Sequence, residues 1–395
     1  MNYFASIEQE PEDPIYGLQV LFKKDPRPEK INLSIGTLPN SDGKAFKFAS
    51  IAKAEANVHS QNLPKDYLPI DGYEPFRLAV QELIVGPKKE NSRAAYTAQA
   101  VGGTGALYIA GQFLARHITK TIFISDPTWV NHRKLFTACG LEVFSYPYVV
   151  AKNGALDIQH LLNTLYAIPI GSAVCLQASC HNPTGIDPTL QEWKEISRIL
   201  KTRNHIALFD IAYLGLGTGL EDDLAPIRLF FEEGHEMLIA SSFSKNMGLY
   251  GERVGALTIA CHEKETLPIA SQIRKIIRTI YSSPPSHGAY IAAECLRSHA
   301  LRGEWHAELH TKRAELDQLR SAFYQEMEKY RPHDPFTALK ASTGLFSICR
   351  LTKSQVLKLR DENAIYLAED GRINIAALPH SRELLHRIVH AIAHV

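Results

Sequence analysis

Short apolar runs rich in β-branched residues alternate with longer amphipathic stretches through the middle of the chain. This alternation predicts an α/β fold with a largely parallel sheet, because a helix between two strands returns the chain to the same end of the sheet. The predicted strands are TIFISDP (121–127), SAVCLQAS (172–179), HIALFDIAY (205–213), MLIASSFS (237–244) and VGALTIA (254–260). Ligands bind at the carboxyl ends of the strands in such sheets, so functional residues are expected there.

After about residue 300 the pattern changes to a long helix, shorter strands and a last helix. Apolar residues recur on one side of the long helix, at Leu309, Leu316, Leu319, Phe323 and Met327. This change predicts a second, smaller domain. Since no repeat, low-complexity tract or flexible linker separates the two parts, we expect them to pack closely around a cleft.

One helix between the predicted strands has clear boundary signals. Asp187 is expected to cap it, Pro188 fits its first turn, and Trp193 and Ile196 begin an apolar stripe at helical spacing. This helix should cover one face of the sheet.

Charge and cysteine content narrow the class of protein. Across 395 residues, 43 Lys and Arg nearly balance 42 Asp and Glu, so there is no general attraction for nucleic acid or an anionic membrane. The six cysteines form no CxxC pair, which suits reduced thiols. The first 17 residues carry four acidic side chains and no basic one, unlike a secretory signal, and no apolar run approaches ~18 residues. We expect a cytoplasmic protein with a small-molecule ligand.

Two short motifs have both an ordinary and a functional interpretation. GGTGAL (102–107) joins glycines to an amphipathic helix, so its backbone amides either form a plain tight turn or hold a phosphate. It lacks the lysine of a P-loop and the third glycine of a dinucleotide fingerprint. HNPTG (181–185) predicts a rigid turn, which would also fix the amide of Asn182.

Two further motifs place polar or aromatic side chains at strand ends. FDIAY (209–213) puts Asp210 and Tyr213 near the end of an apolar strand, where an aspartate either caps the next helix or meets a buried cation. SDPTW sets Trp129 beyond another strand, where simple packing is the ordinary explanation. Each signal is modest when taken alone.

Their joint position, together with Lys245, is more informative. Lys245 follows the apolar run EMLIAS in the segment SSFSKNMGLYGERVGAL, close to the carboxyl end of a predicted strand. If these strand ends meet at one edge, a planar ring that carries a phosphate and an aldehyde uses the whole set. The glycine amides and Arg253 suit the phosphate, Trp129 the ring face, Asp210 a ring nitrogen and Lys245 the aldehyde. That ring is pyridoxal phosphate.

The chain resembles the fold-type I, pyridoxal-phosphate-dependent aminotransferases of class I, and among them the aspartate and aromatic aminotransferases. The resemblance runs almost from end to end and rests on NLSIG (32–36), DYLPIDGYEPFR (66–77), GGTGAL, SDPTWVNH, HNPTG, DIAY, SFSKNMGLYGERVG, IYSSPPSHGA (280–289) and GRIN (371–374).

The resemblance implies an α/β architecture of two domains. The large domain, 44–312, would hold a mostly parallel seven-stranded sheet flanked by helices. The small α+β domain would combine 15–43 with 313–395, after an N-terminal arm at 1–14. The resemblance also implies a homodimer with shared active sites.

For the cofactor, the resemblance implies that Lys245, Asp210 and Tyr213 are catalytic. Lys245 would bind pyridoxal 5'-phosphate covalently and carry the substrate proton, while Asp210 would pair with the ring nitrogen. Asn182 and Tyr213 would hold the ring hydroxyl, and Trp129 would stack on the ring. The implied phosphate ligands are Gly103, Thr104, Ser242, Arg253 and, from the partner subunit, Tyr67.

For the substrate, the resemblance implies that Arg372 grips the α-carboxylate as a planar fork, which a lysine does not imitate. Arg278 from the partner subunit would meet a side-chain carboxylate. The implied substrate site also includes Gly36, Trp129 and Asn182.

Three positions depart from the family pattern. Gly102 stands where relatives usually keep a serine, so one hydroxyl to the phosphate is lost and weaker phosphate binding is expected. Gln177 and Ser283 stand where the aspartate enzymes more often show histidine and asparagine. Gln177 would touch the relay behind Asp210 with His132, and Ser283 would lie beside Arg278, so they leave fine substrate preference open.

The implied reaction moves an amino group between an amino acid, aspartate, glutamate or an aromatic one, and a 2-oxo acid such as 2-oxoglutarate. Alternatives are an aromatic-preferring transaminase, a lyase or decarboxylase on the same fold, a nicotinamide-dependent dehydrogenase, and a ligand-binding regulator. Arg372 together with Arg278 favours transamination over decarboxylation, in which the carboxylate leaves. The incomplete glycine fingerprint argues against nicotinamide.

A histidine stripe near the C-terminus is the one pattern that resembles a metal site. His386, His390 and His394 fall at i, i+4 and i+8, on one face of the last helix. No carboxylate or cysteine stands at ligand spacing, so we interpret the histidines as partial positive charge at a helix C-terminus and predict no metal.

Overall fold

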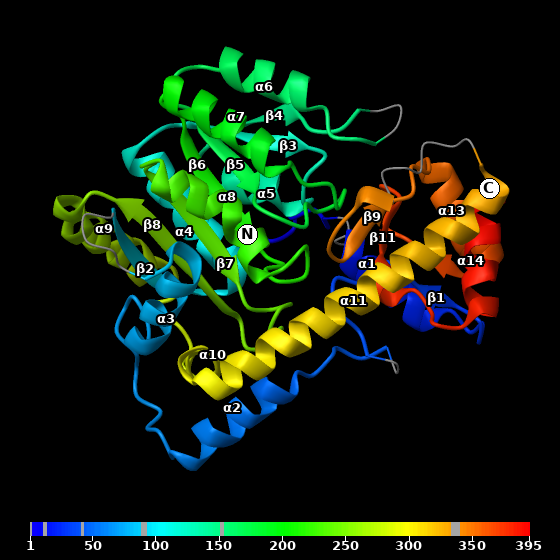
Figure 1. The fold of residues 1–395 in the computed structure, drawn as a ribbon, viewed down its shortest axis with the longest axis horizontal. Coiled ribbons are helices and arrows are strands. Elements are labelled where there is room, and N and C mark those ends of the chain that lie inside the picture. Colours follow the sequence, from blue (N-terminus) through cyan, green and yellow to red (C-terminus); the bar gives the residue numbers. More distant parts are fainter. Residues whose placement is uncertain (1, 11–13, 41–42, 88–92, 151–153, 333–339) are drawn as a thin grey trace.

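The computed structural model describes residues 2–10, 14–40, 43–87, 93–150, 154–332 and 340–395 (Figure 1). Within these ranges, seven strands form one sheet in the order β2-β8-β7-β6-β5-β3-β4, and β8 runs antiparallel to its two neighbours. The strands are β2 (Ala94–Val101), β3 (Thr121–Asp126), β4 (Glu142–Pro147), β5 (Ala173–Gln177), β6 (Ile206–Ile211), β7 (Met237–Ser242) and β8 (Val254–Cys261). The five strands predicted from the sequence are confirmed, and β2 and β4 are added at the edges.

Helices cover both faces of this sheet, and two apolar cores lie between helices and strands. One face carries α4 (Gly102–His117), α5 (Asn131–Ala138) and α9 (Thr266–Ile280). The other carries α3 (Glu74–Val85), α6 (Ile158–Ala167), α7 (Leu190–Thr202), α8 (Leu220–Glu232) and α10 (His287–Arg297). This is the layered α/β arrangement expected from the alternating sequence.

The alternation of side chains along each strand decides which face receives the polar residues at the strand ends. In β6, Phe209 packs against Trp193 of α7 and Phe230 of α8, whereas Leu208 belongs to the core beneath α4. Asp210, two residues after Leu208, therefore faces the α4 side. By the same alternation Gln177 at the end of β5 and Ser242 at the end of β7 fall on that side.

The start of α7 differs from the sequence expectation. Thr189 is the N-cap, with a capping box in which its side chain accepts from the Glu192 N–H at 3.3 Å. Asp187 instead accepts hydrogen bonds from the N–H groups of Cys180 (2.7 Å) and His181 (2.9 Å). The predicted cap at Asp187 was wrong because this carboxylate closes the preceding turn rather than the helix.

The helix α11 (His299–Tyr330) runs from the sheet-containing part into the second part (Figure 1). Its predicted apolar stripe is confirmed, since Leu309, Leu316, Leu319, Phe323 and Met327 are all buried. Near its start, the indole N–H of Trp305 donates to the Asn246 carbonyl at 2.6 Å, one residue beyond Lys245. The helix α2 (Ala49–Ser60) packs against both α10 and α11.

The second part is built from short elements around the far half of α11 (Figure 1). Two small pairs form, β1 (Ile31–Asn32) parallel to β10 (Ile365–Tyr366) and β9 (Phe346–Ile348) antiparallel to β11 (Arg372–Asn374). The remaining elements there are α1 (Pro14–Lys24), α13 (Lys353–Asn363), the short helix η2 (Ile375–Ala377) and α14 (Arg382–His394). The domain boundaries 1–14, 15–43 with 313–395, and 44–312 stay a prediction.

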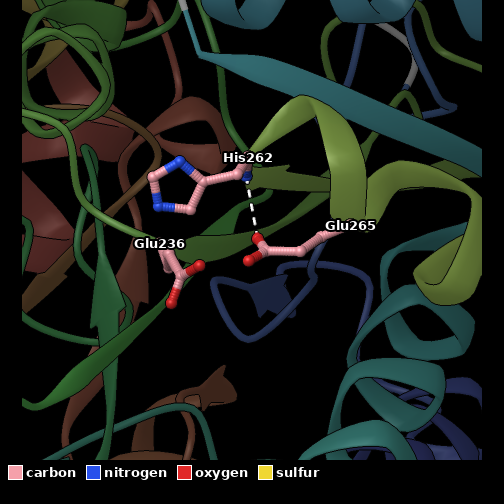
Figure 2. A group of neighbouring side chains, drawn as sticks. All are labelled: Glu236, His262 and Glu265. Atoms are coloured by element: carbon pink, nitrogen blue, oxygen red, sulfur yellow. Dashed lines mark hydrogen bonds between the residues drawn. The ribbon is translucent and has the colours of Figure 1, made fainter.

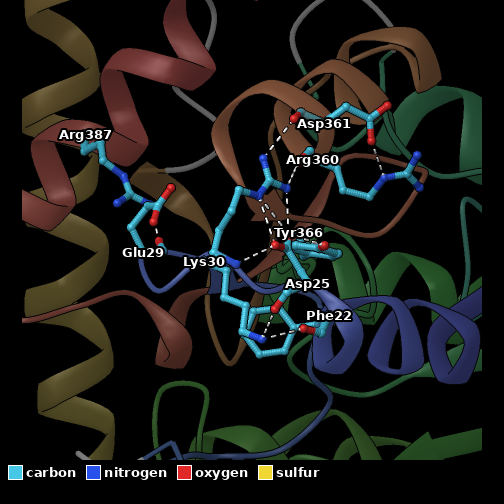
Figure 3. A network of polar contacts seen from close by, with 9 residues as sticks. Phe22, Asp25, Glu29, Lys30, Arg360, Asp361, Tyr366 and Arg387 are labelled. Atoms are coloured by element: carbon cyan, nitrogen blue, oxygen red, sulfur yellow. Dashed lines mark hydrogen bonds and ion pairs between the residues drawn. The ribbon is translucent and has the colours of Figure 1, made fainter.

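A polar network explains why residues near the start of the chain join this second part (Figure 3). The Asp25 carboxylate accepts from the Arg27 guanidinium at 2.6–3.0 Å and from the Tyr366 hydroxyl at 2.7 Å. These bonds hold the pKa of Asp25 well below its usual range. Arg27 also donates to the carbonyls of Arg360 and Asp361, each at 2.8 Å. The network fixes the segment that places β1 beside β10.

Candidate active site

A pocket opens at the carboxyl ends of β5, β6 and β7, on the side covered by α4. Nine of the predicted cofactor residues line it: Gly103, Thr104, Trp129, Asn182, Asp210, Tyr213, Ser242, Lys245 and Arg253. Four more residues complete the lining, namely Leu107, Gln177, Ala212 and Ser244. Residues up to about 150 positions apart in the sequence therefore meet in one place, as the parallel-sheet argument required.

One end of the pocket is suited to an anion. The first turn of α4, with Gly103 and Thr104, presents backbone N–H groups that the helix itself leaves without acceptors. Ser242 lies opposite, so close that a Cβ on Gly103 would come within 3.0 Å of the Ser242 Cβ. The guanidinium of Arg253 closes this end, held by the Tyr250 carbonyl at 3.0 Å. The absence of a side chain at position 103 keeps the cradle open.

Gly102 lies directly against the guanidinium of Arg253. It adopts φ +68°, and a Cβ there would lie 2.4 Å from Arg253 Nη2. The guanidinium thus occupies the space that a serine side chain would need. Whether phosphate binding is weaker than in relatives, as the lost hydroxyl predicts, stays a prediction.

The opposite end of the pocket holds a buried carboxylate within a relay of hydrogen bonds. Asp210 Oδ2 lies 3.0 Å from Nε2 of His132, and His132 Nδ1 lies 2.7 Å from the Thr128 hydroxyl. His132 is fully buried and Asp210 nearly so. The Trp129 ring stands edge-on to the His132 ring, with centroids 5.2 Å apart. The relay fixes the carboxylate where a ring nitrogen could meet it.

Lys245 carries its amine into the pocket, with Nζ 5.0 Å from the centroid of the Tyr213 ring. Removal from water lowers the pKa of this amine to about 8, and the positive charges of Arg253 and Arg372 act in the same direction. Asp210 opposes them. A neutral amine, which a nucleophile or a proton acceptor must be, is therefore far more accessible at neutral pH than for an exposed lysine.

Arg372 reaches from β11 in the second part of the chain to the edge of the pocket. Nη1 donates to Asn182 Oδ1 and Nη2 to the Ser34 carbonyl, each at 3.2 Å. The guanidinium carbon lies 4.2 Å from the centroid of the Phe346 ring, which supports it from one side. Asn182 Nδ2 in turn donates to the Tyr213 hydroxyl at 3.4 Å.

Gly36 is positioned by a residue that the sequence analysis did not single out. Asn374, which is fully buried, donates through Nδ2 to the carbonyls of Ile35 (3.0 Å) and Thr37 (2.7 Å) on either side of Gly36. Phe346 was missed because it stands in none of the motifs of the sequence analysis, and Asn374 was missed because no role was assigned to it. The motif GRIN, which ends at Asn374, was the available signal.

Tyr67 and Arg278, both predicted site residues, are not part of the lining of the pocket of their own chain. Tyr67 is 94% exposed, and Arg278 is exposed near the end of α9, where it donates to the Ser282 hydroxyl. Ser283, expected beside Arg278, follows immediately and bonds through its N–H to the Tyr281 carbonyl at 2.8 Å. The prediction that Tyr67 and Arg278 act from a partner subunit therefore concerns surfaces that this chain leaves exposed.

The predicted absence of a metal site stays a prediction. Tyr330 packs edge-on against His390 and His394, while His386 Nδ1 lies 2.8 Å from the Glu326 carboxylate. In the described part of the chain, one group of three possible ligands comes together elsewhere: Glu236, His262 and Glu265 (Figure 2). It lies at the end of β7 and β8 remote from the pocket. Two of its members are exposed, and the His262 N–H occupies one Glu265 oxygen at 2.9 Å.

None of the helices in the described ranges combines the length and the apolar character that a bilayer crossing needs.

Comparisons with known proteins agree with one another. The profile of the family described as aminotransferase class I and II matches residues 28–392. The aspartate aminotransferase of Escherichia coli (strain K12) is 41% identical over 379 residues, which cover 95% of this chain and 96% of that protein.

Solved structures give the same picture. An aromatic-amino-acid aminotransferase from Burkholderia pseudomallei, covalently bound to pyridoxal phosphate, superposes with a TM-score of 0.94 at 39% identity, covering 100% of this chain and 99% of that chain. An aromatic amino acid aminotransferase from Psychrobacter sp. B6, cocrystallised with aspartic acid, has a TM-score of 0.94 at 32% identity, covering 99% and 98%.

Proposed function

The chain belongs to the class I and II aminotransferases, and from this premise we propose that it binds pyridoxal 5'-phosphate at Lys245. The observation that carries the proposal is the convergence of an amine of lowered pKa, a buried carboxylate and an anion cradle in one pocket. When bound, the cofactor supplies an aldehyde for amino groups and a ring that accepts electrons. The lyase, dehydrogenase and regulator alternatives do not follow from family membership.

The residues of the pocket fit this group from end to end. The first turn of α4 with Ser242 and Arg253 suits a phosphate dianion, and Asp210 suits a protonated ring nitrogen. The hydroxyl of Tyr213 and the amide of Asn182 stand where they can hold a ring oxygen. Burial raises the pKa of Tyr213 above its usual range, so its hydroxyl stays a hydrogen-bond donor throughout the neutral range.

In the reaction, Lys245 Nζ would move the substrate proton. A neutral Nζ would accept a proton from the α-carbon of the bound amino acid and would later give a proton back. Both Arg253 and Arg372 favour the neutral form of this amine, whereas Asp210 favours its charged form. The same residues that bind the ligands thus adjust the proton acceptor.

We propose amino acid and 2-oxo acid substrates with two carboxylates, such as aspartate, glutamate and 2-oxoglutarate. Arg372, 5% exposed and held by Asn182 Oδ1 and the Ser34 carbonyl, would bind the α-carboxylate. Arg278 of the partner subunit would bind the second carboxylate. The similar Psychrobacter structure is that of an aromatic amino acid aminotransferase, and it was cocrystallised with aspartic acid. We therefore propose aromatic amino acids as a second class of substrate.

We further propose a homodimer with shared sites. Tyr67 and Arg278 are exposed in this chain, although the pocket needs both to match the family pattern. The N-terminal arm also exposes three large apolar side chains, those of Tyr3, Phe4 and Ile7, which are 69–78% exposed. A second copy of the chain would cover them. A cytoplasmic location is part of the same proposal.

The test is chemical and spectral. Borohydride reduction of the holoenzyme and peptide mass mapping should place the cofactor on Lys245, and an adduct on another lysine would refute the assignment. Addition of aspartate should shift the visible absorption band, and 2-oxoglutarate should restore it. A band that shifts without returning would indicate a lyase or decarboxylase instead.

A further inference from the structure

Gln177, the last residue of β5, makes three hydrogen bonds at the back of the pocket. Its Oε1 accepts from the Asn182 N–H at 2.8 Å, and its Nε2 donates to the Asn182 carbonyl at 3.0 Å. A third, longer bond of 3.5 Å runs from Nε2 to the Thr128 hydroxyl. The side chain is 7% exposed, so these bonds are largely shielded from water. The side-chain amide of Gln177 thus bonds both the N–H and the carbonyl of Asn182.

Asn182 connects two other residues of the proposed site. The Asn182 side chain contacts Tyr213 through Nδ2 and Arg372 through Oδ1. On the other side of Gln177, Thr128 leads through His132 to Asp210. Gln177 is also the register partner of Asp210 in the neighbouring strand. It therefore stands between the groups proposed for the ring oxygen and substrate and the relay proposed for the ring nitrogen.

We propose that Gln177 is a positioning residue that orients Asn182, and through it Arg372, for substrate carboxylate binding. The proposal rests on the proposed function of the pocket. A neutral amide is suited to the task because it offers a donor and an acceptor side by side at every pH. A carboxylate lacks the donor. The glutamine thus keeps the Asn182 backbone in place without adding a titrating group beside Asp210.

The substitution Gln177→Leu removes both bonds and leaves the buried N–H and carbonyl of Asn182 without partners, so the turn must shift to satisfy them. We expect the dissociation constant of maleate, a dicarboxylate without an amino group, to rise at least tenfold in the holoenzyme. The KM for aspartate should rise more than kcat falls. The pH titration of the cofactor absorption band should also move, since Asn182 contributes to the ring-oxygen contact.

Gln177→Glu keeps the shape of the side chain but makes its donor depend on pH. A protonated carboxylic acid can still donate to the Asn182 carbonyl, whereas the ionised form cannot, and it also repels Asp210. Maleate affinity relative to wild type should therefore be close to normal at low pH and fall as the pH rises through the titration of the introduced carboxyl group. Wild type should lack this extra step. This variant also covers the case in which Gln177→Leu fails to fold.

Tyr148→Phe is the matched control. The Tyr148 hydroxyl donates to the Ile186 carbonyl at 2.7 Å, so the variant loosens the same turn without touching Asn182. It should lower stability while maleate affinity and the band titration stay within about twofold of wild type. Hydrogen exchange at the Asn182 amide, measured without cofactor, should accelerate in Gln177→Leu and not in Tyr148→Phe.

The outcomes separate the possibilities. Wild-type affinity and titration in Gln177→Leu, no extra step in Gln177→Glu, or an equal loss in Tyr148→Phe would each overturn the positioning role. If the absorption band of the wild-type protein does not respond to aspartate, the proposed function is overturned instead. Hydrogen exchange at the Asn182 amide would still test the hydrogen bonds between Gln177 and the Asn182 backbone in that case.

Discussion

Replacing Lys245 by methionine should make the cofactor-free protein more stable at neutral pH. Folding places this amine where its pKa falls from 10.5 to about 8, so at pH 7 the folded state holds a charge that its surroundings disfavour. That shift corresponds to roughly 3 kcal/mol. Because the structure around a buried charge relaxes and reduces the penalty, we expect Lys245→Met to raise the free energy of unfolding by about 1–3 kcal/mol.

The pH dependence identifies the cause. Between pH 8 and 10.5 the unfolded lysine binds more protons than the folded one, so wild-type stability rises with pH in this window and the advantage of the variant shrinks. Urea unfolding of both apoproteins, at one protein concentration to hold any dimerisation constant, measures the difference at pH 7 and near pH 10. A gap that stays constant across this range, or a variant less stable at pH 7, would refute the reasoning.

Three further predictions concern the site and its support. Arg278→Leu should reduce kcat/KM for aspartate by an amount worth about 2–5 kcal/mol, the cost of stranding one member of a buried charge pair, and reduce that for phenylalanine far less; equal losses in steady-state assays would mean that Arg278 does not select the substrate. Asp210→Ala should keep the fold, seen by circular dichroism, but lose most turnover, since an uncharged ring nitrogen withdraws electrons poorly; near-normal turnover with bound cofactor would contradict its role. Trp305→Phe removes the indole N–H that bonds the Asn246 carbonyl at 2.6 Å, so the free energy of unfolding should fall by about 1–3 kcal/mol, and an unchanged urea midpoint would show that the carbonyl finds another donor.

The fold was predictable where periodicity and turn chemistry agree. The five central strands and the apolar side of α11 follow directly from their patterns. The cap of α7 did not follow from its pattern, because Asp187 is engaged in a tertiary contact and Thr189 caps the helix instead. Asp187 accepts from two backbone N–H groups and from the Thr343 hydroxyl at 2.7 Å. Position 343 lies 156 residues away, beyond the reach of any local signal.

The site was predictable to the extent that it stands at strand ends. Asp210 and Lys245 were found because functional residues gather at the carboxyl ends of parallel strands, whereas Ser242 came only from the family resemblance. The two hydrogen bonds between Gln177 and the Asn182 backbone were not predictable, since they depend on how the turn after β5 folds back on its own strand. The predicted roles of Tyr67 and Arg278 came from the family resemblance, because they depend on contacts between two copies and not on a pattern within one chain.

The helix α11 has a mechanical consequence for the site. It is continuous over 32 residues, or about 48 Å at 1.5 Å per residue, with Trp305 anchored beside Lys245 and its far half in the second part of the molecule. A stiff rod held near one end acts as a lever. The part of the helix from Trp305 to Tyr330 is about 38 Å long, so a tilt of about 5° about Trp305 moves the far tip by about 3 Å, and Arg372 belongs to the part that would travel with the tip. A tilt of α11 would therefore change the distance between Lys245 and Arg372, and the hydrogen bond from Arg372 Nη1 to Asn182 Oδ1 at 3.2 Å opposes it.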